Sequence, residues 1–151
     1  MKFKINDKLI DGVEEAPKWI ANGLEPEAVM YAEEFGKWLA GLETSTGRLR
    51  KDDKLTTTQF RNIFSEVVRI RLQDFNEKNE KALLLLKPRM AYNMARQNKR
   101  GGQTLNEVMQ PAMDAVFKGE SREEKQNRFN HFADLFEAIL AYHRVYDPKS
   151  K

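Results

Sequence analysis

The stretch REEKQNRFNHFADLFEAILAYHRVY, Arg122–Tyr146, is the longest and most strongly patterned segment of this sequence. Its large apolar side chains recur at three- and four-residue steps, which place them on one face of an α-helix. That face consists of Phe129, Phe132, Leu135, Phe136, Ile139, Leu140 and His143. Ser121 with Glu124 is the signature of a capping box at the start of the helix, and Asp147 and Pro148 end it. A face this aromatic predicts the centre of a helical bundle.

Four further segments upstream carry helical patterns of apolar residues. They are expected at about residues 25–42, 57–76, 78–97 and 105–118. Thr56 with Gln59 and Thr104 with Glu107 are capping-box signatures at the second and fourth starts. A glycine pair at residues 101–102 is expected to end the third helix. The sequence therefore predicts an all-α fold, a compact bundle of about five helices with the long C-terminal helix at the centre.

Residues 1–24 are less regular than the rest of the chain. MKFKI alternates apolar and charged residues, which allows a short strand or an extended arm, and turn signals follow at Asp11-Gly12 and Asn22-Gly23. No fold is predicted for this segment. The expected organisation is an N-terminal arm at 1–24, a single helical-bundle domain at 25–147 and a tail at 148–151.

Residues 83–100, LLLLKPRMAYNMARQNKR, join an apolar block to five cations with no carboxylate among them. Four consecutive leucines cover a whole helical turn, which predicts deep burial of that turn. Pro88 removes a backbone donor, so a kink or a division into two helices is expected just before it. Beyond it, Met90, Tyr92 and Met94 are expected to pack while Arg89 and Arg96 project outward.

The net charge of +3 over 151 residues is unevenly distributed. Residues 1–47 carry −4, residues 48–100 carry +8 and residues 101–151 carry −1. A basic middle segment is the pattern expected when one face of a protein meets a polyanion. The alternative is the solvated face of a stable bundle.

Composition excludes several classes of protein. Cysteine is absent, which rules out disulfides, thiolate catalysis and cysteine metal sites. The longest aliphatic run, at residues 83–86, is far shorter than the ~20 residues that a membrane span needs. The first ten residues, MKFKINDKLI, contain no apolar core of a secretory signal. A soluble, cytoplasmic protein without a membrane partner is expected.

No catalytic motif is visible. Neither His131 nor His143 has a Glu or His three or four positions away, and Asp134, three after His131, is isolated. His143 lies on the apolar face of its helix, which favours a structural, hydrogen-bonded role. We therefore expect no enzyme activity, no metal and no cofactor. A small helical nuclease that uses His143 is a minor alternative.

Arginine and lysine on helix faces can neutralise phosphates without reading bases. The sequence has no RNA-recognition aromatic motif, zinc finger or GXXG loop, so a protein that grips the nucleic-acid backbone fits better than a sequence-specific reader. A helical adaptor that binds an acidic protein partner without RNA is the alternative. Arg61 has a further alternative, an ion pair with Glu66 or Glu137 within the bundle.

Three stretches in this order and spacing resemble a known family. They are TTTQFRNIFSEV at residues 56–67, LLLLKPRMAYNMAR at 83–96 and FADLFEAILAYHRVY at 132–146. The chain is similar in them to the small subunit of type III-A CRISPR effector complexes, the Csm complex. It departs from the family at Ala95 and at Asp147, where the family often has glycine. Residues 1–45 carry no resemblance.

The resemblance implies a non-catalytic subunit of an RNA-guided antiviral ribonucleoprotein. Its partners would be guide RNA and target RNA, other subunits of the Csm complex, and copies of itself stacked along the filament. The family's recurrent basic positions correspond to Arg61, Lys87, Arg89 and Arg96. The full set of expected RNA-backbone contacts is Lys54, Arg61, Arg69, Lys87, Arg89, Arg96 and Arg100.

Overall fold

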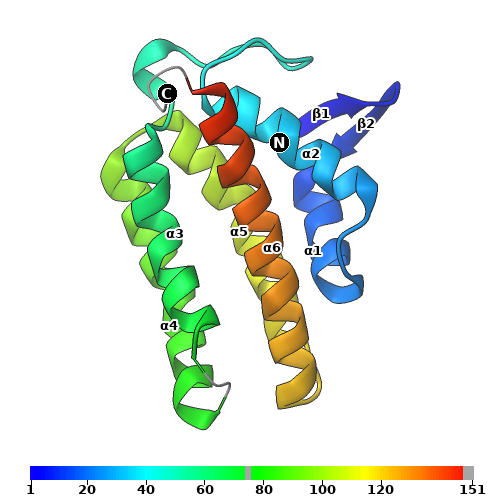
Figure 1. Ribbon diagram of the computed structural model, residues 1–151, viewed down its shortest axis with the longest axis vertical. Helices are drawn as coiled ribbons and strands as arrows, with labels where there is room; N and C mark the ends of the chain where they lie inside the picture. The colour runs from blue at the N-terminus through cyan, green and yellow to red at the C-terminus, as the bar shows by residue number, and fades with distance from the viewer. Residues whose placement is uncertain (74–75, 148–151) are drawn as a thin grey trace.

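The computed structural model describes residues 1–73 and 76–147 (Figure 1). In these residues two short strands precede six α-helices. The elements are β1 (Lys2–Ile5), β2 (Lys8–Asp11), α1 (Gly12–Asn22), α2 (Pro26–Leu39), the 3-10 turn η1 (Lys51–Asp53), α3 (Thr57–Arg71), α4 (Glu77–Gln97), α5 (Arg100–Phe117) and α6 (Arg122–Tyr146). The predicted all-α class is confirmed, with one small antiparallel hairpin added to it.

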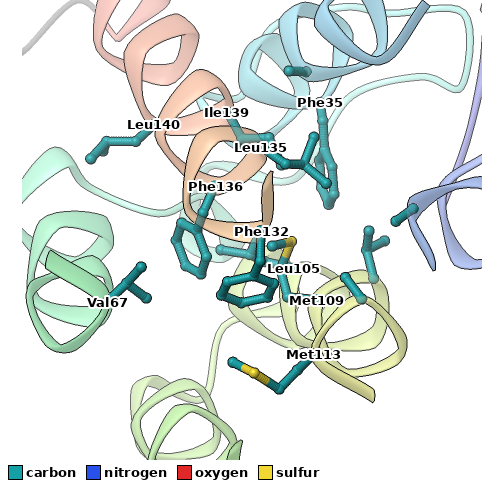
Figure 2. Close-up of a cluster of buried hydrophobic side chains, with 14 of the residues drawn as sticks. Phe35, Val67, Leu105, Met109, Met113, Phe132, Leu135, Phe136, Ile139 and Leu140 are labelled. Carbon is teal, nitrogen blue, oxygen red and sulfur yellow. The ribbon is translucent and has the colours of Figure 1, made fainter. Parts of the chain in front are cut away.

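Helix α6 is the central element, as its aromatic face predicted, and it packs against α1, α2, α3 and α5. Side chains of α2, α3 and α5, such as Phe35, Val67 and Leu105, meet those of α6 around Phe132 and Phe136 (Figure 2). Phe136 is fully buried, and its ring lies 5.6 Å from that of Phe60 and 5.2 Å from that of Phe64, both on α3. The centre of the core is thus a cluster of aromatic rings joining α3 to α6.

The first 24 residues belong to the same core. Asn6 and Asp7 have positive φ angles of 51° and 63°, which close a tight hairpin between β1 and β2. Asp11 then caps α1 by accepting a hydrogen bond from the Val13 amide. Helix α1 packs on α5 and α6, and Phe3 of β1 is fully buried. This segment, for which the sequence predicted no fold, therefore helps to build the bundle.

The start of α5 differs from the prediction. Helix α4 ends at Gln97, followed by Asn98 in the left-handed region, while the glycine pair at residues 101–102 lies inside the first turn of α5. A Cβ at Gly101 would lie 2.9 Å from the Asp53 carbonyl oxygen, so glycine at this position lets the η1 turn lie close to α5. The expected capping box at Thr104 is wrong, because Thr104 is buried within α5.

Fewer leucines of α4 are buried than the sequence predicted. Leu83 and Leu86 are fully buried, but Leu84 and Leu85 are 55% and 51% exposed, because only one face of the helix meets the core. Tyr92 was expected to pack and is instead 65% exposed. The helix continues through Pro88, so the predicted division into two helices does not occur.

The two other predicted capping boxes are present to different degrees. Thr56 and Gln59 form both hydrogen bonds of the box at α3. Ser121 accepts from the Glu124 amide at α6, but the Glu124 carboxylate accepts from the Glu120 amide rather than from Ser121.

No helix in the described part of the chain is both long and apolar enough to cross a membrane.

Candidate nucleic-acid interface

Helices α3 and α4 lie side by side at one flank of the bundle (Figure 1). Side chains of both helices line a groove between them. It consists of two adjoining hollows of about 590 and 320 Å³ that share Arg89. The larger is lined by Arg69, Gln73, Asn76, Lys78, Asn79, Lys81, Ala82, Leu85 and Arg89, and the smaller by Glu66, Pro88, Arg89, Tyr92 and Asn93. We call the two hollows together the α3–α4 groove.

The groove carries more positive than negative charge. Arg69 and Arg89, both predicted to contact RNA, share the single carboxylate of Glu66, at N–O distances of 2.6 and 3.8 Å. Lys78 and Lys81 line the same groove and form no ion pair with a described residue. Four cations therefore face one carboxylate among the described lining residues. The two lysines were not predicted, since neither belongs to a motif or to the resemblance.

Four other predicted cations lie at one end of the bundle, where α3 and α5 begin and α4 ends (Figure 1). They are Lys54, Arg61, Arg96 and Arg100, which we call the basic end. None of them forms an ion pair within the described residues. The amide of Arg100 donates to Asp53, just before α3, at 3.3 Å, which fixes the start of α5 beside the loop that leads into α3.

A hollow of about 390 Å³ adjoins the basic end. Arg48, Arg50 and Arg100 line it together with Asp53, and the Arg48 guanidinium lies 3.5 Å from the Glu43 carboxylate. Arg48 and Arg50 were not among the predicted contacts. Both residues belong to the basic linker GRLRKDDKL, which the sequence shows. The sequence does not show that this linker lies against α5.

Lys87 lies apart from the other predicted cations. Its Nζ is 2.5 Å from the Asp114 carboxylate of α5, and its carbonyl accepts a hydrogen bond from Gln110. This contact places Lys87 on the side of α4 that faces α5, whereas Arg89 faces α3. Lys87 is therefore already neutralised by an acidic neighbour.

The alternative ion pairs considered for Arg61 do not form. Glu66 is occupied by Arg69 and Arg89, and Glu137 lies 3.3 Å from Arg71. Arg71 also contacts Asp134 at 2.5 Å, so this arginine joins α3 to α6. Arg71 therefore has a structural partner, while Arg61 is left free of carboxylates among the described residues.

The two histidines lie within the packing of the bundle. His143 is fully buried, and its Nε2 donates to the Leu55 carbonyl at 2.7 Å, since a carbonyl oxygen can only accept. Burial lowers the pKa of His143, which the Leu55 hydrogen bond and the Asp147 carboxylate partly oppose. His131 Nδ1 lies 2.8 Å from the Ile20 carbonyl of α1. The described residues contain no cluster of three or more metal-ligating side chains.

The depressed pKa of His143 predicts loss of stability in mild acid. The unfolded chain takes up a proton near pH 6.5, whereas the folded chain keeps His143 neutral to a lower pH. The free energy of unfolding should fall as the pH drops below about 6.5, by at most about 1.4 kcal/mol per pH unit. Urea unfolding at several pH values between about 7 and 5.5, above the titration of ordinary carboxyls, measures this slope.

The His143→Gln variant is the control for that slope. Its amide can still donate to the Leu55 carbonyl, but it does not titrate. Whatever its absolute stability, the variant should show a flatter pH dependence in this window. An unchanged slope would assign the acid sensitivity to another group.

A family model, described as Csm2 Type III-A, matches residues 39–149 of the chain, well over half of its length. The chain belongs to the Csm2 Type III-A family. The resemblance found in the sequence is thereby confirmed, and this Csm2 protein is a small subunit of the type III-A CRISPR Csm complex. The family is one of non-catalytic small subunits. A search of curated proteins found no match.

The groove and the basic end both lie within the matched part of this Csm2 protein. The hairpin, α1 and all but the last residue of α2 precede it. The family match therefore covers every residue that was predicted to contact RNA.

Proposed function

We propose that this Csm2 subunit holds guide RNA and the paired target RNA by their phosphate backbones, without reading their sequence. The observation that carries the proposal is the basic end, where four exposed or half-exposed cations have no carboxylate partner among the described residues. Such cations can release condensed counterions from RNA without first breaking an ion pair. The family's place in an RNA-guided complex supports the same ligand.

The ion pairs allow the seven predicted cations to be ordered by their expected contribution to RNA binding. Arg61 and Arg96 are exposed, and they belong to both the basic end and the stretches that resemble the family. Arg69 and Arg89 share one carboxylate, so together they keep one net positive charge for a phosphate. Lys87 would have to exchange Asp114 for RNA and gain little. We infer that Arg61 and Arg96 contribute most and Lys87 least.

The positions of Arg89 and Arg96 on α4 support one path for the RNA. Arg89 and Arg96 are seven residues apart and so lie on the same side of the helix. A backbone that enters the α3–α4 groove at Arg89 would therefore reach the basic end at Arg96. Further copies of this subunit and other Csm subunits would continue the path along the RNA.

The double variant Arg61→Glu, Arg96→Glu tests this function. It should weaken binding of duplex RNA at every sequence tested, and lower the slope of log affinity against log salt by about one for each phosphate that is no longer neutralised. Both side chains are exposed, so far-ultraviolet circular dichroism should remain that of the wild type. Filter binding or fluorescence anisotropy over a salt series gives both quantities.

A matched control carries the same change of charge at other places. Lys8 on β2 and Lys118 after α5 are outside both clusters, so Lys8→Glu, Lys118→Glu should bind RNA nearly as the wild type does. Equal losses in the two double variants would mean that only net charge matters. Salt-independent binding, or capture of an acidic protein in place of RNA, would contradict the proposal and favour the adaptor function.

A further inference from the structure

The smaller hollow of the α3–α4 groove contains an aromatic side chain that the fold does not use. Tyr92 is 65% exposed, while the core-facing side of α4 around it is supplied by Met90 and Met94, each 1% exposed. Within the described part of the chain, its hydroxyl forms no hydrogen bond and its ring packs on no other ring. A large ring held on a rigid helix and left open to solvent is available to a ligand.

The surroundings of Tyr92 match the chemistry of a nucleobase. Pro88, Arg89 and Asn93 line the hollow with it, supplying an apolar edge, a planar guanidinium and an amide with both donors and an acceptor. Single-stranded RNA is recognised in proteins by stacking of unpaired bases on aromatic rings and guanidinium planes. The hollow, about 320 Å³, lies at the lower end of the usual range for ligand sites, which favours one small planar group.

The cations around Tyr92 favour RNA over an uncharged partner. Arg89 lies three residues before Tyr92 and Arg96 lies four residues after it, so both neighbour its ring on the helix surface. A base on Tyr92 would therefore have a guanidinium on each side of it along α4, where its flanking phosphates pass. Glu66 is the one carboxylate that lines this hollow among the described residues, and Arg69 and Arg89 already pair with it.

From this arrangement we propose that the hollow at Tyr92 binds one unpaired nucleobase of RNA, which stacks on the tyrosine ring. The amide of Asn93 faces the edge of the base, and Arg89 holds the neighbouring phosphate. The site rests on the proposed RNA-backbone function and adds to it a preference for RNA that has at least one base free of pairing. Because every base has an aromatic face, the site tolerates any sequence.

The test compares Tyr92→Ala with Tyr92→Phe in the full chain. The probes are an unstructured single-stranded RNA, with and without one fluorescent purine analogue, and a fully paired duplex RNA. Tyr92→Ala should weaken single-strand binding at least about fivefold, since stacking on an aromatic ring contributes roughly 5- to 140-fold per base. Tyr92→Phe keeps the ring and should stay close to the wild type. Stacking should also quench the analogue in the wild type and not in Tyr92→Ala.

Leu84→Ala is the matched control, because Leu84 is a 55% exposed apolar residue on the same helix that does not line the groove. It should leave the affinity for both RNAs unchanged. Tyr92→Ala should weaken duplex binding less than single-strand binding, because a paired base cannot stack on the ring. A single-strand affinity equal to the wild type in Tyr92→Ala would overturn the nucleobase site, even where duplex binding stays salt-sensitive and the backbone function holds.

Two further outcomes distinguish a nucleobase site from a failure of RNA binding altogether and from a protein contact. If the wild type binds neither RNA in a salt-dependent way, the backbone function fails and the nucleobase site fails with it. If Tyr92→Ala changes self-association in sedimentation and leaves single-strand binding intact, Tyr92 is a protein contact and the proposal is overturned. A loss of single-strand binding without a change in self-association supports it.

Discussion

Replacing Phe136 by alanine is expected to lower the free energy of unfolding by about 3–5 kcal/mol. Its ring is fully buried at the centre of the bundle and touches the rings of Phe60, Phe64 and Phe132, at centroid distances of 5.6, 5.2 and 6.0 Å. Alanine removes most of the side chain and leaves a cavity that rigid rings on α3 and α6 cannot easily fill. Urea unfolding followed by circular dichroism measures the loss.

Val145→Ala provides the comparison on the same helix. Val145 is 56% exposed, so removing its methyl groups should change the free energy of unfolding by no more than about 0.5 kcal/mol. A loss of less than about 1 kcal/mol in Phe136→Ala would mean that the aromatic cluster does not hold α3 against α6. The Phe136 variant is also expected to weaken RNA binding, because α3 carries one side of the groove.

Gly36→Ala is expected to destabilise the protein by about 1–3 kcal/mol, although alanine is the better helix former by about 1 kcal/mol. A Cβ at Gly36 would lie 2.7 Å from both the His143 amide nitrogen and the Tyr142 Cβ, and 3.0 Å from the Ile139 carbonyl oxygen. Two of these atoms belong to the backbone of α6, so relief requires α2 to move away from it. The steric cost therefore outweighs the gain in helix propensity. Thermal or urea unfolding gives the sign directly.

Gly102→Ala serves as the control, because at this position the gain in helix propensity should exceed the steric cost of the added Cβ. Gly102 also lies in a helix, but its nearest neighbours would be 3.6 Å from an added Cβ, an ordinary contact. The substitution should be neutral or should stabilise the protein by up to about 1 kcal/mol. If both alanine variants are stabilising, α2 and α6 are not packed as closely as the structure has them.

Most local patterns predicted the fold correctly, although the capping box expected at Thr104 and the helix end expected at residues 101–102 were wrong. The apolar face of α6 and the capping box at Thr56 and Gln59 each depend on residues within a few turns of one helix. Periodicity failed for residues 83–86, because a run of four leucines carries no information on which of them meet the core. It also gave no fold for the hairpin, whose strands are only four residues each.

The candidate site depended more on tertiary structure. The pairing of Lys87 with Asp114 joins residues 27 apart, and that of Arg71 with Asp134 joins residues 63 apart. Which cations are neutralised therefore depends on how α3, α4, α5 and α6 are packed. The same packing brings Arg48 and Arg50 of the linker beside Arg100 of α5.

The sequence by itself determined the helical class, the central helix, the family and the basic middle segment. These rest on periodicity, composition and the order of motifs, all of which are properties of the chain read along its length. Only the tertiary structure decided that Tyr92 is exposed, that Gly36 lies at a helix crossing and that Lys87 is already paired. Each depends on the position of a neighbouring helix, because burial and ion pairing are properties of side chains brought together from distant segments.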